Sequence, residues 1–185
     1  MRFTLTYTGE LKANGSPKHK HDLRRHFHSQ LRRLWKLPPL SASSHWFTLA
    51  AEDKSIDLNR IVPPFRFVPL VSPSIRLVCE LCIFLLRPEP PGAVVTQCGD
   101  IDNRLKTLFD ALRAPKNATE IPKGAVPGPD EDPFFCLLED DALITAVSVE
   151  TERLLTANQG STEVHLDIQV LTRPTAVIIA NMGLV

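Results

Sequence analysis

The sequence predicts a single α/β (α+β) domain in which a small mixed β-sheet packs against two main helices. Four segments have the pattern of strands, and two others carry apolar residues at helical spacing. The 185 residues are enough for one compact core, and the chain shows neither an internal repeat nor a separate domain. We therefore expect one domain over residues 1–185.

The expected strands lie at both ends and in the middle of the chain. Residues 2–8, "RFTLTYT", alternate in polarity, whereas residues 74–86 are apolar on both alternations, as in an interior strand covered on both faces. Residues 143–155 are expected to form a third strand and residues 163–171 a fourth. The inward side chains of the fourth strand would be Val164, Leu166, Ile168 and Val170. The intervening "TANQGS" predicts a hairpin turn between the last two strands.

The two expected helices span residues 22–36 and 103–113. In the first, Asp22 is the expected N-cap. Its apolar stripe is Leu23, Phe27, Leu31 and Leu34, with Trp35 as a core residue. The apolar stripe of the second is Leu105, Leu108, Phe109 and Leu112.

Two segments are rich in proline. In residues 45–73, "PPFRFVPLVSP" has too many prolines for a central strand. Residues 114–133 contain five prolines and few large apolar groups, which predicts a long surface loop. The tail "PTAVIIANMGLV" is apolar enough to pack onto something, for which a second copy of the chain is one candidate.

Composition argues against a membrane protein and against a disulfide or zinc scaffold. The N-terminal residues do not resemble a signal peptide, and no apolar run is long enough to span a bilayer, so we expect a cytoplasmic protein. We expect buried, reduced thiols at the four cysteines, because Cys79 and Cys82 of "CELC" would point to opposite faces of a strand. The other two are Cys98 and Cys136.

Charge is segregated although the net charge is zero. Residues 1–36 hold nine lysines and arginines against two acids, and residues 100–152 hold twelve acids against five bases. A basic surface of this kind can contact nucleic-acid phosphates, although a solvated helix face remains the alternative. The candidates for phosphate contacts are Lys18, Lys20, Arg24, Arg25, Arg32 and Arg33. The neighbouring histidines, expected to be solvated or phosphate-facing, are His19, His21, His26 and His28.

The acidic part of the chain begins with "GDIDNRLKTLFDAL". Asp100 and Asp102 would point the same way only in an extended segment, so the helix should begin just after them. Lys106 follows Asp102 by four residues and would lie on the same side one turn later. Asp110 points away, and we assign it no chemistry.

A second acidic group, in "LLEDDALITAV", precedes an expected strand. If Asp141 lies beside Asp100 and Asp102, the three carboxylates offer the oxygen ligands that Mg²⁺ prefers, with Asp140 and Glu139 around them. Such a site can activate water and neutralise charge on a phosphodiester, and Lys106 would assist at the phosphate. Taken singly, each acidic block is also explained by helix capping or by turn formation.

Together the two blocks resemble the RusA-like Holliday junction resolvases. In that family an Asp-x-Asp-Asn unit precedes a helix with a lysine and the residues Phe-Asp-Ala-Leu, and an Asp-Asp-Ala unit then enters a strand. The resemblance covers about residues 75–171. It implies metal ligands at Asp100, Asp102 and Asp141 and a catalytic lysine at Lys106.

The resemblance also implies a homodimer that nicks branched DNA with Mg²⁺ or Mn²⁺, acting in recombination and repair. The chain differs from many members in having no basic residue in "VVTQCG", just before Asp100. Two alternatives remain: a non-catalytic nucleic-acid-binding protein on the same fold, and an interaction protein from a phage or defence context.

Overall fold

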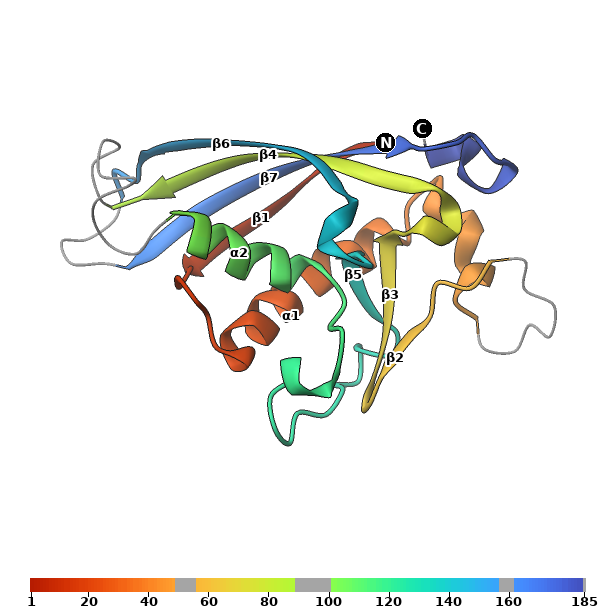
Figure 1. The fold of residues 1–185 in the computed structure, drawn as a ribbon, viewed down its shortest axis with the longest axis horizontal. Coiled ribbons are helices and arrows are strands. Elements are labelled where there is room, and N and C mark those ends of the chain that lie inside the picture. The colour runs from red at the N-terminus through yellow and green to blue at the C-terminus, as the bar shows by residue number, and fades with distance from the viewer. Residues whose placement is uncertain (49–55, 89–100, 157–161, 185) are drawn as a thin grey trace.

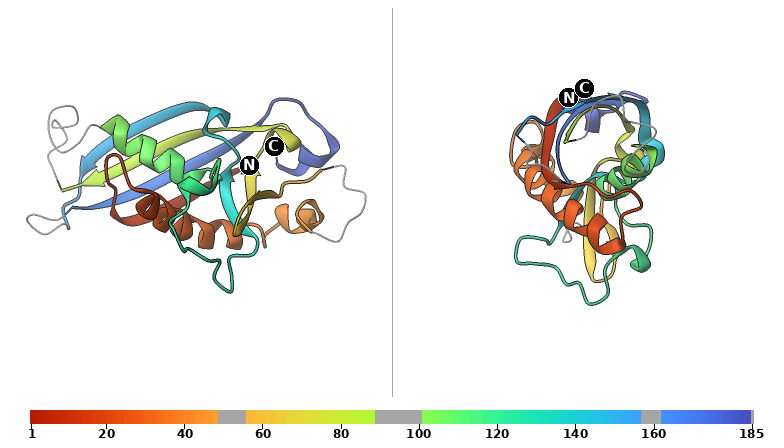
Figure 2. Two further views of the ribbon diagram at one scale, coloured as in Figure 1. Left: turned by 60° about the horizontal axis from the view of Figure 1, so that its bottom comes forward. Right: turned by 90° about the vertical axis from the view of Figure 1, so that its left-hand side faces the viewer.

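The computed structural model describes residues 1–48, 56–88, 101–156 and 162–184, and it confirms the α+β class. Within these residues the strands form two sheets, with the strand orders β1-β7-β4-β6 and β2-β3-β5. Helices α1 and α2 lie together on one face of the four-stranded sheet, and the opposite face of that sheet is uncovered (Figures 1 and 2).

The four-stranded sheet contains all four strands that the sequence predicts. These are β1 (Arg2–Glu10), β4 (Leu77–Arg87), β6 (Ile144–Arg153) and β7 (Glu163–Pro174). Strand β7 runs antiparallel to both of its neighbours, and β6 runs parallel to β4. The interior position of β4 is confirmed, but the expected cover on both of its faces is wrong: alternate residues are buried under the helices, and those on the outer face are half-buried. The four expected inward side chains of β7 are fully buried: Val164, Leu166, Ile168 and Val170.

The predicted hairpin between β6 and β7 is wrong, because β4 lies between these two strands. An interior strand needs a neighbour on each side, and β4 takes β7 on one side and β6 on the other. Of the six residues expected to form the turn, 157–161 lie outside the described part of the chain.

The second sheet corrects the interpretation of the proline-rich segment. It consists of β2 (Arg60–Val62), β3 (Phe65–Val71) and β5 (Phe134–Leu138), with β3 in the centre. Its proline, Pro69, lies beyond Phe67, the last residue of β3 that pairs with β2. At Pro69 the strand therefore has a neighbour on one side only, which is where a sheet tolerates a residue without an N–H.

Helix α1 spans Pro17–Leu34 and begins five residues before the expected start. Ser16 rather than Asp22 is the N-cap, and its hydroxyl oxygen accepts a hydrogen bond from the His19 N–H at 3.2 Å. The pair Ser16 and Pro17 explains the early start, because serine is a preferred cap and proline a preferred first residue of a helix.

Helix α1 is buried on two sides. The predicted stripe of Leu23, Phe27 and Leu31 belongs to the main core under the four-stranded sheet. A second stripe, made of His21, Arg24 and His28, is also buried, and both histidine rings contact Phe134 of β5. The expectation that His21 and His28 are solvated is therefore wrong, because the helix is packed between the two sheets.

Side chains of α1 also protect the edge of the four-stranded sheet that β1 forms. The Gln30 side chain bonds both the N–H and the carbonyl oxygen of Thr6, at 3.0 and 2.7 Å, and His26 also contacts that oxygen.

Helix α2 spans Ile101–Leu112 and connects β4 to the second acidic block. It begins at the end of the sheet where β4 finishes and runs back beneath the sheet (Figure 1). After the helix, Arg113 forms a parallel bridge with Leu138, and the Ala114 N–H donates to the Leu138 carbonyl oxygen at 2.8 Å. The C-terminal end of α2 is thereby joined to the end of β5.

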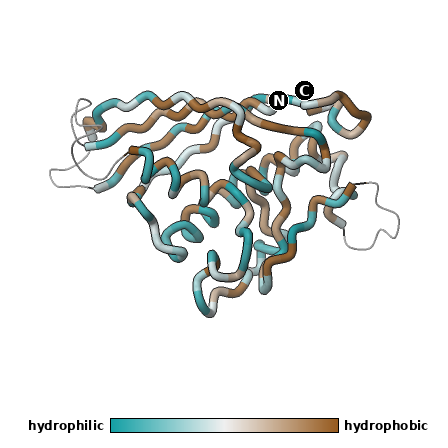
Figure 3. The backbone as a smooth tube through the Cα atoms, viewed as in Figure 1, coloured by the Kyte–Doolittle hydropathy of each residue, from teal (hydrophilic) through white to brown (hydrophobic). Residues whose placement is uncertain are grey.

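The remaining short helices are 3₁₀ turns in the connections. They are η1 (Leu40–Trp46), η2 (Pro73–Ile75), η4 (Ala118–Glu120), η5 (Asp141–Leu143) and η6 (Ile179–Leu184). The chain ends lie side by side, since the Met1 ammonium donates to the Leu184 carbonyl oxygen at 2.8 Å (Figure 1). In Figure 3 the C-terminal segment is markedly hydrophobic, and Ile179 is 91% exposed while Leu184 is buried.

The cysteines and the helices can be compared with what the composition predicts. Cys79 and Cys136 are buried free thiols, and Cys82, on the opposite face of β4 from Cys79, is half-buried; Cys98 lies outside the described residues. Burial raises the pKa of Cys79 and of Cys136 to about 12, so both stay protonated. No helix in the described ranges combines the length and apolar character needed to cross a bilayer.

Candidate functional site

The first acidic block lies at the start of α2. The helix begins at Ile101, two residues before the expected start, so Asp102 lies inside the first turn rather than just before the helix. Both Asp102 and Lys106 are exposed. The spacing of four residues places them on one side of the helix, as expected. Neither side chain is ion-paired in the part of the chain that the structure describes. Asp100 lies outside the described residues.

The second acidic block lies at the junction of β5, η5 and β6. Asp140 caps η5, where its side chain accepts a hydrogen bond from the Ala142 N–H at 2.9 Å. Its other carboxylate oxygen lies 3.0 Å from Nζ of Lys116, and Oδ1 of Asp141 lies 3.7 Å from the same ammonium. One lysine therefore neutralises two neighbouring carboxylates.

The electrostatics of this block follow from those contacts. The Ala142 N–H and then the Lys116 ammonium lower the pKa of Asp140 to about 2, so it is ionised throughout the ordinary pH range. Glu139 faces a different cation: its Oε1 accepts from Nε of Arg60 at 2.7 Å, and its Oε2 accepts from the Ser72 hydroxyl. Glu139 thus belongs to a structural ion pair.

A cavity of about 330 Å³ lies beside the second block. It combines apolar walls with charged residues of both signs, at the end of the sheet where the parallel strands β3 and β5 finish. Carboxyl ends of parallel strands are common ligand sites. The lining residues are Arg60, Ile61, Val62, Ala114, Pro115, Lys116, Glu139 and Asp140.

The structure does not bring Asp102 and Asp141 together in one chain. Asp141 lies near the C-terminal end of α2, as its ion pair with Lys116 shows, whereas Asp102 lies at the other end of the helix. From Asp102 to Leu112 the helix rises by about 15 Å, whereas two carboxylates that share an ion lie about 4–6 Å apart. Among the described residues, no three histidine, cysteine, aspartate or glutamate side chains gather closely enough to hold a metal ion. Carboxylate oxygens are suitable ligands for Mg²⁺, but the described residues of a single chain bring too few of them together to bind the ion.

Most of the expected phosphate-binding residues have partners within the protein. Arg24 is buried and donates to the carbonyl oxygens of Asp110 and Arg113. The other ion pairs on this side of the molecule are Lys18–Asp22, Lys20–Asp110, Arg25–Glu131 and Arg32–Asp130. Arg33 is exposed at the end of α1. The basic face of α1 therefore serves largely to hold α2 and the proline-rich loop.

Lys116 and Arg60 were not identified from the sequence. Lys116 lies in the segment interpreted as a surface loop, and Arg60 lies in the segment that gave no clear element. Their acidic partners are 24 and 79 residues away along the chain, and no local pattern connects such positions.

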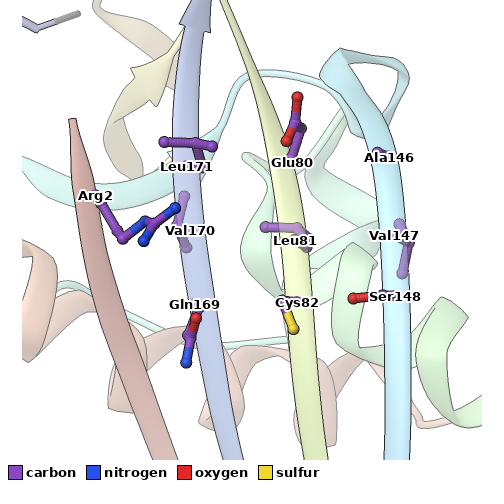
Figure 4. Close-up of a pocket in the computed structure, with 10 residues that line it drawn as sticks. All are labelled: Arg2, Glu80, Leu81, Cys82, Ala146, Val147, Ser148, Gln169, Val170 and Leu171. Atoms are coloured by element: carbon purple, nitrogen blue, oxygen red, sulfur yellow. The ribbon is translucent and has the colours of Figure 1, made fainter.

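The outer face of the four-stranded sheet carries a second hollow, of about 250 Å³ (Figure 4). Arg2, Glu80, Cys82 and Gln169 are among its lining residues, and none of the expected site residues borders it. We assign it no chemistry.

Comparisons of the chain with protein-family models, with curated proteins and with solved structures find no match.

Proposed function

We propose that the protein is a divalent-metal-dependent endonuclease that hydrolyses phosphodiester bonds in DNA, with branched junctions as the substrate class. The observation that carries the proposal is the position of the two motif blocks on one β–α–β unit. Asp102 and Lys106 are exposed on the first two turns of α2, the next described element after β4, and Asp140 and Asp141 stand directly before β6, which pairs parallel with β4.

The lack of partners at Asp102 and Lys106 supports the proposal. Several other charged residues of the two helices are ion-paired, as Lys20 and Asp110 are at 2.7 Å. A carboxylate and an ammonium that are exposed, one turn apart, and unpaired in the described structure are available to an external ligand. A phosphodiester with a divalent ion offers both charges.

In this proposal Asp102 and the sequence-assigned Asp100 would hold Mg²⁺ or Mn²⁺ at the start of α2, and the Lys106 ammonium would contact the phosphate. Asp141, at the other end of the helix in the same chain, would not reach this ion. The reaction adds water to phosphorus and breaks one P–O bond, which leaves a phosphate on one strand end and a hydroxyl on the other. Asp140, already engaged by Ala142 and Lys116, holds η5 in place.

The test compares the wild type with Asp102→Asn and Lys106→Ala on four-way junctions, flaps, linear duplexes and single strands, each with Mg²⁺ or EDTA. We expect metal-dependent nicking that falls at least about a hundredfold in both variants, since each removes a charge used at the phosphate. Asp22→Asn and Lys123→Ala are matched controls, because both residues are exposed and lie outside the two motif blocks.

Equal amounts of nicked product from the wild type and Asp102→Asn would exclude the proposed endonuclease activity. In that case salt-sensitive DNA binding without nicking would identify a non-catalytic nucleic-acid-binding protein. The other alternative is an interaction protein. One feature of the described structure supports it: the apolar side chains Val177, Ile179 and Met182 are exposed near the C-terminus. A partner protein bound with no DNA affinity would support that function.

A further inference from the structure

Three consecutive acidic residues of the proline-rich loop are each paired with an arginine. Two of these arginines belong to α1 and the third to β3, so the loop contacts both a helix and a strand of the second sheet. In Figure 1 the loop lies at the bottom of the molecule. The ion pairs are Asp130–Arg32 at 2.6 Å, Glu131–Arg25 at 2.8 Å and Asp132–Arg66 at 2.8 Å. We call residues 126–132 the acidic strap.

The acidic strap lies on the surface between two anchored points. None of its residues is buried, and the carboxylates of Asp130 and Asp132 are 70% and 65% exposed. On either side of it, Ile121 and Phe134 are buried in the same apolar cluster. The strap can therefore leave the arginines while the rest of the loop stays in place.

Polar contacts hold the strap in position. Nδ1 of His28 accepts from the Phe135 N–H, so its Nε2 carries the proton and donates to the Asp130 carbonyl oxygen at 2.9 Å. The Gly128 N–H donates to a carboxylate oxygen of Glu131 at 2.8 Å. Contacts between exposed charges weaken as salt rises, and an external anion can replace an exposed carboxylate.

The arginines suit phosphates as well as carboxylates. Arg25 donates from Nε and Nη2 to the two carboxylate oxygens of Glu131, at 2.8 and 3.1 Å. The planar guanidinium makes the same two-point contact with a phosphate group. The strap carboxylates therefore stand where phosphate oxygens can bind.

We propose that Arg25, Arg32 and Arg66 form a binding surface for the phosphodiester backbone of DNA, and that the acidic strap covers this surface until DNA displaces it. DNA as the ligand rests on the proposed function. The cover itself rests on the three ion pairs.

The three pairs also define the ligand that can displace the strap. A single phosphate ion replaces one carboxylate and leaves two ion pairs that hold the strap. A DNA strand presents phosphates in a row, so it can replace the carboxylates together. The strap therefore favours a polyanion over small anions.

The cover is tested by neutralising the exposed carboxylates in Asp130→Asn/Asp132→Asn. Binding of the full chain to labelled duplex DNA is measured in EDTA over a range of salt concentrations. We expect at least about tenfold tighter binding at low salt and a salt slope steeper by about 1.8, since each phosphate contact contributes about 0.9. Glu150→Gln/Glu152→Gln, on exposed positions of β6, is the control that removes the same charge.

A third substitution identifies the arginines as the cause. Arg32→Gln, added to Asp130→Asn/Asp132→Asn, removes one of the two released guanidinium groups and should remove about half of the gain in slope. A neutralised strap that binds DNA no more tightly than the β6 control would overturn the proposal. A gain that Arg32→Gln leaves intact would overturn it as well.

Hydrogen exchange in the unmodified protein is a second measurement. DNA should speed exchange of the Gly128 N–H, which is bonded within the strap, and leave the Ala114 N–H slow, since it is bonded to Leu138. Bound DNA with no change at Gly128 would show that the strap stays closed.

Failure of this proposal and failure of the proposed function are distinguishable. Metal-dependent nicking, with DNA binding unchanged by the neutralised strap, retains the endonuclease and overturns the cover. Tighter, more salt-sensitive binding in the neutralised strap, without nicking by the wild type, overturns the endonuclease and retains the cover. No DNA binding by any variant overturns both.

Discussion

Arg24 of α1 donates a hydrogen bond from Nη2 to the carbonyl oxygen of Asp110 in α2, at 2.7 Å. A second bond runs from Nε of Arg24 to the carbonyl oxygen of Arg113, at 3.1 Å. Carbonyl groups in the last turn of a helix have no partner within the helix, and Asp110 lies in that turn, while Arg113 follows directly after it. One buried guanidinium therefore donates hydrogen bonds to two carbonyl oxygens at the end of α2. The end of α2, which positions the second acidic block, is thereby fixed to α1.

Arg24→Met is expected to destabilise the protein by about 2–4 kcal/mol, because it leaves two carbonyl oxygens unpaired in the interior. Urea denaturation followed by the fluorescence of Trp35 and Trp46, both buried, measures the change. The control is Arg33→Met on the exposed side of the same helix, with an expected change within about 0.5 kcal/mol. Equal stability of the two variants would show that Arg24 does not hold the helix end.

Stability should fall as the pH drops below about 6.5, the ordinary histidine pKa. Burial, followed by repulsion from Arg24, lowers the pKa of His21 to about 4, and burial also lowers the pKa of His28. A depressed histidine pKa means that the unfolded state binds protons more readily, so stability is complete above pH 6.5 and declines toward pH 4. Each imidazole contributes at most about 1.4 kcal/mol per pH unit in this window.

His21→Leu separates this effect from general acid unfolding. The Nε2 atom of His21 is buried and has no hydrogen-bond partner among the described residues, and the ring contacts Phe65 and Phe134. Unfolding free energies at pH 7 and pH 5 are expected to differ less in His21→Leu than in the wild type. An unchanged difference would mean that His21 titrates normally in the folded protein.

Gly15→Ala should destabilise the contact between the start of α1 and α2. The Gly15 N–H donates to Oγ1 of Thr107 at 2.9 Å, and an added Cβ would lie 2.7 Å from Cγ2 of the same threonine. We expect a loss of about 1–3 kcal/mol from overpacking. Gly128→Ala is the control, since its added Cβ would meet nothing closer than 3.5 Å. Thermal unfolding of both variants decides between a steric effect and a general effect of replacing glycine.

Lys116→Gln should raise the pKa of Asp140 from its value of about 2, measured by the pH dependence of the carboxyl carbon shift in NMR. The rise should be partial, because the larger cause of the depression is the Ala142 N–H, which the substitution leaves in place. Lys123→Gln, in the same loop, is the control. A pKa that does not move would show that Lys116 does not pair with Asp140 in solution.

The sequence predicts the individual elements better than their partners. The alternation in β7 and the stripes of both helices report which side of an element is buried, and burial is a local property of the pattern. The largely apolar β4 predicted cover on both faces, whereas only one of its faces is fully buried. Strand order depends on contacts between distant segments, so the sequence suggested a hairpin where β4 intervenes. The central position of β3 was missed because Pro69 lies where β2 has already ended.

The same limit applies to the candidate site. Residue types, spacing and the family resemblance predicted a site at Asp102, Lys106 and Asp141, and the structure places the first two on one side of α2 and the third beyond the other end of the helix. The pairing of Arg25 with Glu131 and of Arg32 with Asp130 joins residues about a hundred positions apart, so the sequence overestimated the cationic surface open to phosphates. Whether a charged side chain faces solvent or a partner is decided by tertiary structure.

The bond between Gln30 and Thr6 sets a limit on self-association. Because that amide blocks the middle of the sheet edge formed by β1, growth by strand addition is confined to the opposite edge, formed by β6. Addition of copies through both edges, which would build a fibril, is therefore not expected.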